Sequence, residues 1–564
     1  MKLFIYLFVF SALFLSGCEK NLDLKPLDAL SEATYFKTEK DFETFANQFY
    51  LTLPDLGSGD DNADLSMATN RSAISNGSYA PAETSSIWDN NYRSIWQSSY
   101  LIEKAGEAPA DIKTAIARYT AEARFFRAFA HFDLLKNFGG VPIVDKRLGI
   151  SSDDILYGPR NTRAEVAAFI LAELDKAIPD LPASGPGTDN GRLSKWAALA
   201  LKARVALFEG TWRKFHENGN NSAEMLDQAI SASTEILNSN LFELFDRRDV
   251  LGDSSYRYYF LLEGTRKTNA AGLTKAAQRE TILARRHDRD ISPSPALNIG
   301  QGVLSPTRKL VDMFLSKDGL PIEKSPLFEG YAEILSEYRN RDPRMKNWLI
   351  TPFQKYWLFT QPAYHKNWDN PGAGGIIYDI AFGILTQTGY STFKMQQEIG
   401  GPHGNDYPVF RLAEIYLILA EALFEKNGAI TDVQLDQSIN KLRTRVGMPS
   451  LNNAFVATNG LDMREEIRRE RSIELYVENF RFDDLRRWKT AETEMPKAVR
   501  GIKWKGTEFE QRLPWSNLVF QLDADGFIVL EAASQRQFLP RHYLRPLPIR
   551  QILLNPSLEQ NPGW

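Results

Sequence analysis

Apolar residues along much of the chain recur at intervals of three and four, which places them on one face of an α-helix. The clearest stripe spans 111–134, and Gly139-Gly140 behind it predicts where that helix ends. Thr162 and Glu165 have capping-box spacing, so a second helix is expected from there to Pro179. Further helices are predicted over 194–208, 223–237, 409–424, 435–446 and 463–477. Short connections between them indicate antiparallel helix pairs, and hence an all-α protein.

The middle of the chain lacks this periodicity. Residues 241–407 are rich in Pro, Gly, Tyr and Trp, so regular helices are expected to be sparse there. We therefore interpret the chain as one helical scaffold that is interrupted by a loop-rich insert. The helix pairs could belong to tetratricopeptide-like repeats of about 34 residues. No clean repeat of that length is present, so a generic helical bundle explains the pattern as well.

The amino-terminal segment has the pattern of a secretory signal peptide. An apolar run over 3–15 follows Lys2 and leads into Ser16-Gly17-Cys18. The run is too short to cross a membrane as a helix, which needs about 20 residues. The small residues before Cys18 resemble a bacterial lipobox, in which the cysteine is acylated and the chain is cut before it. We expect a signal peptide over 1–17, then a lipid anchor on Cys18 and a spacer over 18–30. Because Cys18 is the only cysteine, no disulfide is expected.

The charge balance argues against nucleic acid as a partner. The chain has 67 basic and 71 acidic residues, a formal charge of −4, and no basic block follows the anchor. Neutral ligands fit this balance better. Aromatic residues make up 12% of the chain and include eleven Trp, a side chain that builds flat, partly wet binding surfaces.

Few residues have a pattern typical of an enzyme. The six histidines are scattered without metal-ligand spacing, and no cysteine is placed to join them. Neither a Gly-x-Ser-x-Gly elbow nor a Gly-rich phosphate loop is present. We therefore predict no catalytic residue, no metal and no cofactor. A glycosidase needs only two carboxylates, so a surface glycoside hydrolase stays as an alternative.

Six blocks of the sequence carry recognisable motifs, among them Gly139-Gly140-Val141-Pro142 and the closing Asn561-Pro562-Gly563-Trp564. The blocks span 119–142, 191–212, 306–344, 411–449, 470–488 and 546–564. In order and spacing they resemble the SusD/RagB family of outer-membrane nutrient-uptake lipoproteins. The resemblance covers nearly the whole chain after Cys18.

This resemblance implies a SusD-like fold with four tetratricopeptide-like helix pairs as scaffold and a ligand-binding half built largely from inserted loops. Residues 31–564 would form one domain, with the scaffold mainly in 31–240 and 408–490, the insert in 241–407 and a closing segment in 491–564. The resemblance also implies a lipoprotein on the outer face of the outer membrane. Such a protein delivers oligosaccharides, or in some members peptides, to a SusC-like, TonB-dependent β-barrel transporter. A helical-repeat scaffold that binds only proteins is the remaining alternative.

Ligand contacts are expected in loops, where aromatic rings can lie against sugars and polar side chains can bind hydroxyls. The first candidate loop contains Asn62 and Arg71, and the second, within the insert, contains Tyr364 and Trp368. Further members of these two loops are Asp60, Asp61, Asp64, Asn70, Tyr79, Trp348 and Trp357. The tryptophans of the predicted helices are assigned to the core instead: Trp88, Trp96, Trp196, Trp212 and Trp488.

Two charged motifs are expected to be structural. Arg471 lies within one helical turn of Glu470 and Glu474, so we expect it to sit between these two carboxylates. The segment over 340–344 places Asp342 before a proline, which is typical of a turn.

Overall fold

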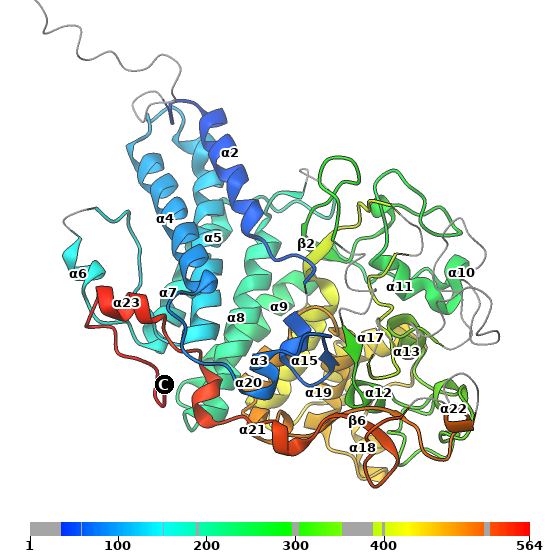
Figure 1. Cartoon of the computed structure of the whole chain (residues 1–564). Coiled ribbons are helices and arrows are strands. Elements are labelled where there is room, and N and C mark those ends of the chain that lie inside the picture. Colours follow the sequence, from blue (N-terminus) through cyan, green and yellow to red (C-terminus); the bar gives the residue numbers. More distant parts are fainter. Residues whose placement is uncertain are drawn as a thin grey trace, which may run out of the picture.

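The computed structural model describes residues 35–57, 59–149, 152–187, 191–295, 304–351, 387–397, 401–511 and 519–564. Long helices gather on one side of the molecule, and shorter elements with long loops occupy the other (Figure 1). The all-α prediction is confirmed, since strands occur in these ranges only as three short pairs. No helix in the same ranges is both long and apolar enough to span a membrane.

Paired helices form the scaffold. Their bounds are α2 (Glu39–Asn47), α4 (Ser86–Glu107), α5 (Lys113–Phe138), α7 (Arg163–Ala177), α8 (Lys195–His216), α9 (Ser222–Asn238), α15 (Leu412–Asn427), α17 (Ile439–Arg445), α19 (Met463–Glu474) and α20 (Arg481–Arg487). α4 packs against α5, α5 against α7, and α8 against α9. α15 packs against both α9 and α19, so the chain returns to the same scaffold after the insert.

Short elements complete the fold. The strands pair antiparallel as β1 (Ser66–Met67) with β3 (Ser305–Pro306), β2 (Thr281–Arg285) with β4 (Tyr407–Arg411), and β5 (Val499–Lys503) with β6 (Phe527–Glu531). The short helices are α3 (Ala73–Asn76), α6 (Asp153–Leu156), α10 (Arg248–Leu251), α11 (Ser255–Tyr259), α12 (Arg308–Met313), α13 (Pro343–Trp348), α16 (Asp432–Asp436), α18 (Asn453–Thr458), α21 (Ala491–Glu494), α22 (Glu508–Gln511) and α23 (Ile549–Leu554).

Most predicted helices are present, and their local signals work as expected. The capping box of Thr162 and Glu165 opens α7, and Gly139 ends α5 with a φ of 76° that favours glycine. α8 continues past its predicted end because Trp212 and Arg213 still face the core. The start predicted at 409 is wrong, since Val409 belongs to β4 and pairs in a sheet with β2. The helix predicted over 435–446 is broken between α16 and α17, where Ser438 has non-helical dihedrals.

Buried charges tie the insert to the scaffold. Arg411, the last residue of β4, lies 2.9 Å from Glu280, 2.8 Å from Glu474 and 2.7 Å from Glu478. Arg445 on α17 shares two of these partners, Glu280 at 3.1 Å and Glu474 at 2.6 Å. All five side chains are buried, so each charge depends on its partners for stabilisation.

The turn over 340–344 is structural, as predicted. The Asp342 carboxylate accepts the backbone N–H of Arg344 at 2.9 Å and caps α13. The Arg344 side chain then reaches Glu470 on α19 and is fully buried there. The turn therefore anchors α13 to the scaffold.

The expected position of Arg471 between Glu470 and Glu474 is wrong. Its Nε donates to Asp484 on α20 at 2.9 Å. Adjacent residues of a helix do not face each other, so Arg471 and Glu470 point toward different partners. Glu474 is already taken by the arginines of the buried network described above.

The tryptophan assignments are confirmed for four residues and wrong for two. Trp348, expected in a ligand-binding loop, is 0% exposed, and its indole N–H donates to the Ile473 carbonyl at 3.0 Å. Trp96, expected in the core, is 43% exposed and stacks on Tyr100. The other four tryptophans are buried in the core, as predicted: Trp88, Trp196, Trp212 and Trp488.

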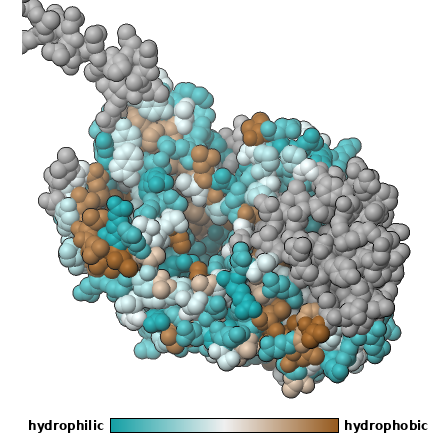
Figure 2. Space-filling view, in the orientation of Figure 1, coloured by the Kyte–Doolittle hydropathy of each residue, from teal (hydrophilic) through white to brown (hydrophobic). Residues whose placement is uncertain are grey.

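Trp96 borders an apolar patch on the surface. Figure 2 shows apolar side chains gathered over α6 and α23. The exposed residues there include Leu156, Tyr157, Leu553 and Leu554. A groove of about 520 Å³ runs between these elements and α4. Surface patches of this kind commonly mark protein contacts.

Candidate functional site

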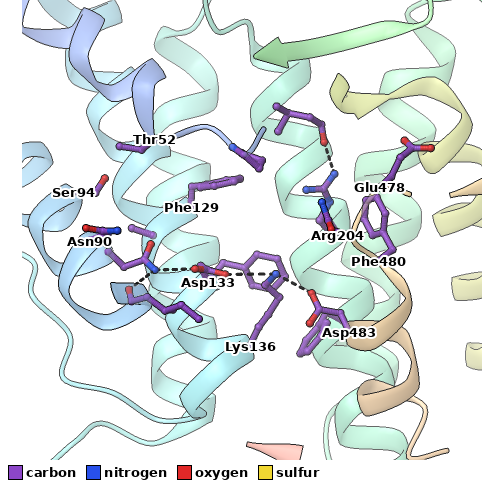
Figure 3. A pocket seen from close by; sticks show the side chains of 18 of the residues that line it. Thr52, Asn90, Ser94, Phe129, Asp133, Lys136, Arg204, Glu478, Phe480 and Asp483 are labelled. Carbon is purple, nitrogen blue, oxygen red and sulfur yellow. Dashed lines mark hydrogen bonds and ion pairs between the residues drawn. The ribbon is translucent and has the colours of Figure 1, made fainter. Parts of the chain in front are cut away.

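A cleft of about 570 Å³ opens between two walls of the scaffold (Figure 3). One wall comes from the α4–α5 hairpin. The other comes from α8, β4 and the start of α20. Its lining residues are drawn from positions between 51 and 487, so the cleft exists only in the folded chain.

The α4 wall presents a polar stripe. Ser86, Asn90, Ser94 and Gln97 follow one another at intervals of three or four, so they lie on one face of the helix. Side-chain amides and hydroxyls can both donate and accept hydrogen bonds. Ligand contacts were expected in loops, so this stripe was not predicted, although its helical spacing is visible in the sequence.

An ion pair joins the two walls at the floor of the cleft (Figure 3). Lys136 Nζ on α5 donates to Asp483 Oδ2 on α20 at 2.8 Å, and Asp133 Oδ1 lies 3.7 Å from the same nitrogen. Asn91 donates to Asp133 at 2.8 Å. Burial by itself raises the pKa of Asp483, but Lys136 and Arg486 outweigh it and hold that pKa below its usual range. Asp483 is therefore ionised at neutral pH and is poorly suited to act as a general acid.

Two phenylalanine rings face the cleft from opposite walls (Figure 3). Phe129 lies on α5, and Phe480 immediately precedes α20. Both rings are only partly buried. The Arg204 guanidinium lies 5.0 Å from the centre of the Phe480 ring and is held by Glu414 at 2.6 and 2.7 Å. Ring faces placed in this way can pack against the C–H faces of a sugar.

The turn that carries Phe480 has a strained backbone. Val477 and Asn479 both have a φ of 64°, a left-handed conformation that is rare for a β-branched residue. The Asn479 N–H donates to Asp60 Oδ2 at 3.2 Å, and a Cβ at Gly59 would lie 2.4 Å from Asn479 Oδ1. Strain of this kind persists only where the surrounding structure holds it, and it is frequent at binding sites.

The first candidate loop therefore supports the cleft from behind. Asp60 is 4% exposed, and burial raises its pKa to about 7. Burial also raises the pKa of the neighbouring Asp61, to about 6. Neither carboxylate is among the residues that line the cleft.

Neither of the two candidate residues of the first loop is among the residues that line the cleft. Each contacts another side chain of the protein. Asn62 accepts a hydrogen bond from Ser72 Oγ at 2.7 Å. Arg71 lies 3.3 Å from Glu531. Their contact with ligand stays a prediction. Four further candidates lie outside the described residues: Cys18, Trp357, Tyr364 and Trp368.

The groups that line the cleft are suited to binding. Its amides, hydroxyls and ring faces can hold a ligand, whereas its carboxylates are engaged in ion pairs. Burial by itself raises the pKa of Glu478, but Arg411 and Lys394 outweigh it and lower that pKa. Across the ranges that the structure describes, no three His, Cys, Asp or Glu side chains gather as a metal site would require.

Comparison with known proteins decides the family. The sequence model described as SusD family matches residues 275–564, more than half of the chain. The chain belongs to the SusD family. A second SusD-like model, described as starch-binding and associating with the outer membrane, matches residues 32–207. The family resemblance predicted from the six sequence blocks is thus confirmed.

Relatives and solved structures of the SusD family agree. A SusD-like protein of Formosa agariphila is 24% identical over 582 residues, which cover 99% of this chain and 97% of that protein. The starch-binding protein SusD of Bacteroides thetaiotaomicron is 24% identical over 372 residues, which cover 62% and 61%. A solved SusD-like protein of Bacteroides fragilis matches with a TM-score of 0.70 at 23% identity and covers 96% of this chain and 100% of that one. A laminarin-binding SusD-like protein matches with a TM-score of 0.60 at 18% identity, covering 94% and 100%. These likenesses confirm the SusD-like fold.

Proposed function

We propose that this protein is a glycan-binding lipoprotein of the outer membrane that captures an oligosaccharide in the cleft and delivers it to a SusC-like, TonB-dependent transporter. The carrying observation is the cleft itself, in which the Phe129 and Phe480 rings lie on opposite walls and a polar helical stripe runs along α4. Stacking rings framed by amides and hydroxyls suit a sugar chain. The starch-binding description of the matched family model and the laminarin-binding structural relative support the same ligand class.

A glycan array against the purified protein tests the binding function. Each hit is then measured with the Phe129→Ala and Phe480→Ala variants and with Val433→Ala, an exposed position on α16 that is not among the cleft-lining residues, as the matched control. Losing one stacking ring is expected to weaken binding about 2- to 12-fold, from about 0.5–1.5 kcal/mol per ring contact. If none of these variants weakens the binding of any hit, the ligand site is expected in the two candidate loops instead, those of Asn62, Arg71, Tyr364 and Trp368. An array without any hit would refute glycan capture.

Lipid anchoring through Cys18 is the second part of the proposal. It rests on the apolar run over 3–15 and the small residues before Cys18. Mass spectrometry of the mature amino terminus should find acyl chains on Cys18, and Cys18→Ser should release the protein from the membrane fraction. Protease shaving of intact cells tests the outward orientation, and complete protection would contradict it.

The apolar patch over α6 and α23 supports a protein partner. We assign it to the transporter because exposed apolar surface beside a groove is typical of stable protein contacts. Leu554→Asp should reduce co-purification with the transporter while leaving glycan affinity unchanged. Val433→Asp, an equally apolar exposed position elsewhere, is the control. If both variants co-purify with the transporter as well as the wild-type protein does, the apolar patch is not the transporter contact.

The alternatives give different outcomes. A glycoside hydrolase would release products from a bound polysaccharide. A peptide carrier would bind peptides and no glycan, and a scaffold that binds only proteins would bind neither.

A further inference from the structure

Most cationic side chains of the cleft already have carboxylate partners. Lys136 is paired with Asp483 at 2.8 Å. Arg204 is held by both carboxylate oxygens of Glu414. Arg487 is paired with Asp484 at 2.8 Å. A negatively charged ligand group could bind these cations only by displacing a protein carboxylate.

The carboxylates of the cleft are equally engaged. Glu478 lies 2.7 Å from Arg411 and 2.6 Å from Lys394. Asp133 accepts from Asn91 at 2.8 Å and lies 3.7 Å from Lys136. A cationic ligand group therefore finds no unpaired anion among these residues.

One cation of the cleft differs from the rest. Within the described part of the chain, Arg93 is the cleft-lining cation without a carboxylate partner, and it donates to Asn90 Oδ1 at 3.2 Å. Arg93 is exposed on α4. Ion pairs at exposed positions contribute little because water screens them. Arg93 alone is thus a weak attraction for an anionic ligand.

Building on the proposed function, we infer that the ligand segment held in the cleft is an uncharged sugar chain, and that the cleft discriminates against uronate and sulfate groups. The groups left for a ligand are the Phe129 and Phe480 rings and the remaining hydrogen-bonding capacity of the α4 stripe, where Asn90 already accepts from Arg93 and Gln97 donates to Gln48. These match hydroxyls and C–H faces. A carboxylate or sulfate would lose hydration without gaining an unpaired buried cation, which makes its burial unfavourable.

Calorimetric titration with oligosaccharides of one length tests the inference. Neutral glucans and mannans are compared with oligogalacturonates and sulfated galactans, each at low and high NaCl. At least one neutral oligomer should bind at least tenfold more tightly than every charged one, with little dependence on salt. A charged oligomer that binds more tightly than all neutral ones, with affinity falling as salt rises, would overturn the inference. Absence of binding by any oligosaccharide, or binding of peptides alone, would instead overturn the proposed function and the inference with it.

Two variants test the mechanism of discrimination. Asp483→Asn removes a partner of Lys136 and should reduce the ratio of neutral-ligand affinity to uronate affinity, called the affinity gap below, by several-fold. Asp133→Asn, at a more exposed carboxylate beside the same lysine, should do so more weakly and provides a second test if the first variant folds poorly. Asp227→Asn on α9 changes the net charge equally but breaks a surface pair with Lys426, so it should leave the affinity gap unchanged. If the affinity gap is unchanged in both cleft variants, or changes equally in all three variants, the pairing of Lys136 does not cause the discrimination.

Discussion

The buried carboxyl of Asp60 is expected to make the stability of the protein depend on pH. This carboxyl is buried behind the strained turn and accepts the Asn479 N–H at 3.2 Å. Burial raises its pKa from 3.8 to about 7, which corresponds to about 4 kcal/mol at 1.36 kcal/mol for each pH unit. Between these two pH values the unfolded chain has lost the proton while the folded protein keeps it. The free energy of unfolding therefore falls as pH rises through this window and levels off above about pH 7.

Asp60→Asn should remove this penalty, because the amide cannot ionise and its oxygen can still accept the Asn479 N–H. At pH 8 the variant should be more stable than wild type by up to about 4 kcal/mol, and below pH 4 the two should be equal. For 564 residues, an unfolding entropy of about 2.1 cal/mol/K per residue converts this into a rise in melting temperature of about 3 °C.

Differential scanning calorimetry from pH 4 to pH 8 measures this difference. Asp180→Asn, which removes an exposed carboxylate, is the control and should show no such pH dependence. If Asp60→Asn melts at or below the wild-type temperature at pH 8 while the control is unaffected, the burial argument is wrong.

Three further changes probe the site and the core. Gly59→Ala should destabilise the protein by about 1–3 kcal/mol in thermal melts, because its Cβ would lie 2.4 Å from Asn479 Oδ1. The control Gly106→Ala, on α4 with open space around it, should stabilise the protein slightly. Equal effects of the two variants would contradict the close approach of Gly59 to Asn479. Arg344→Met should cost about 3–5 kcal/mol of unfolding free energy, because Asp342 loses its ion-pair partner and Glu470 keeps only the longer pair with Arg443. Arg339→Met, at an exposed pair, should cost less than about 1 kcal/mol, and similar losses for both variants would refute the buried network. Asn90→Ala combined with Gln97→Ala should weaken glycan binding about tenfold in titration, at about 0.5–1.5 kcal/mol per hydrogen bond, while Asn238→Ala on α9 should not, and undiminished affinity would exclude the α4 stripe.

The local pattern of the chain was sufficient for most of the helices and for some of their ends. Thr162 and Glu165 cap α7, and Gly139 ends α5, because these signals act within one turn of the backbone. The order of the sequence blocks was also sufficient for the family. Periodicity failed where a distant partner overrides it. Val409 becomes part of the strand β4 because β2, far earlier in the chain, pairs with that strand.

The sequence by itself determined most of the scaffold helices and the family, because each depends on local spacing or on motifs in a fixed order. Only the tertiary structure decided which side chains share the cleft. Lys136 and Asp483 meet there although hundreds of residues separate them, and Trp348 is buried because α13 packs onto the scaffold. Burial and ion pairing depend on contacts between distant segments, and no local pattern records these contacts.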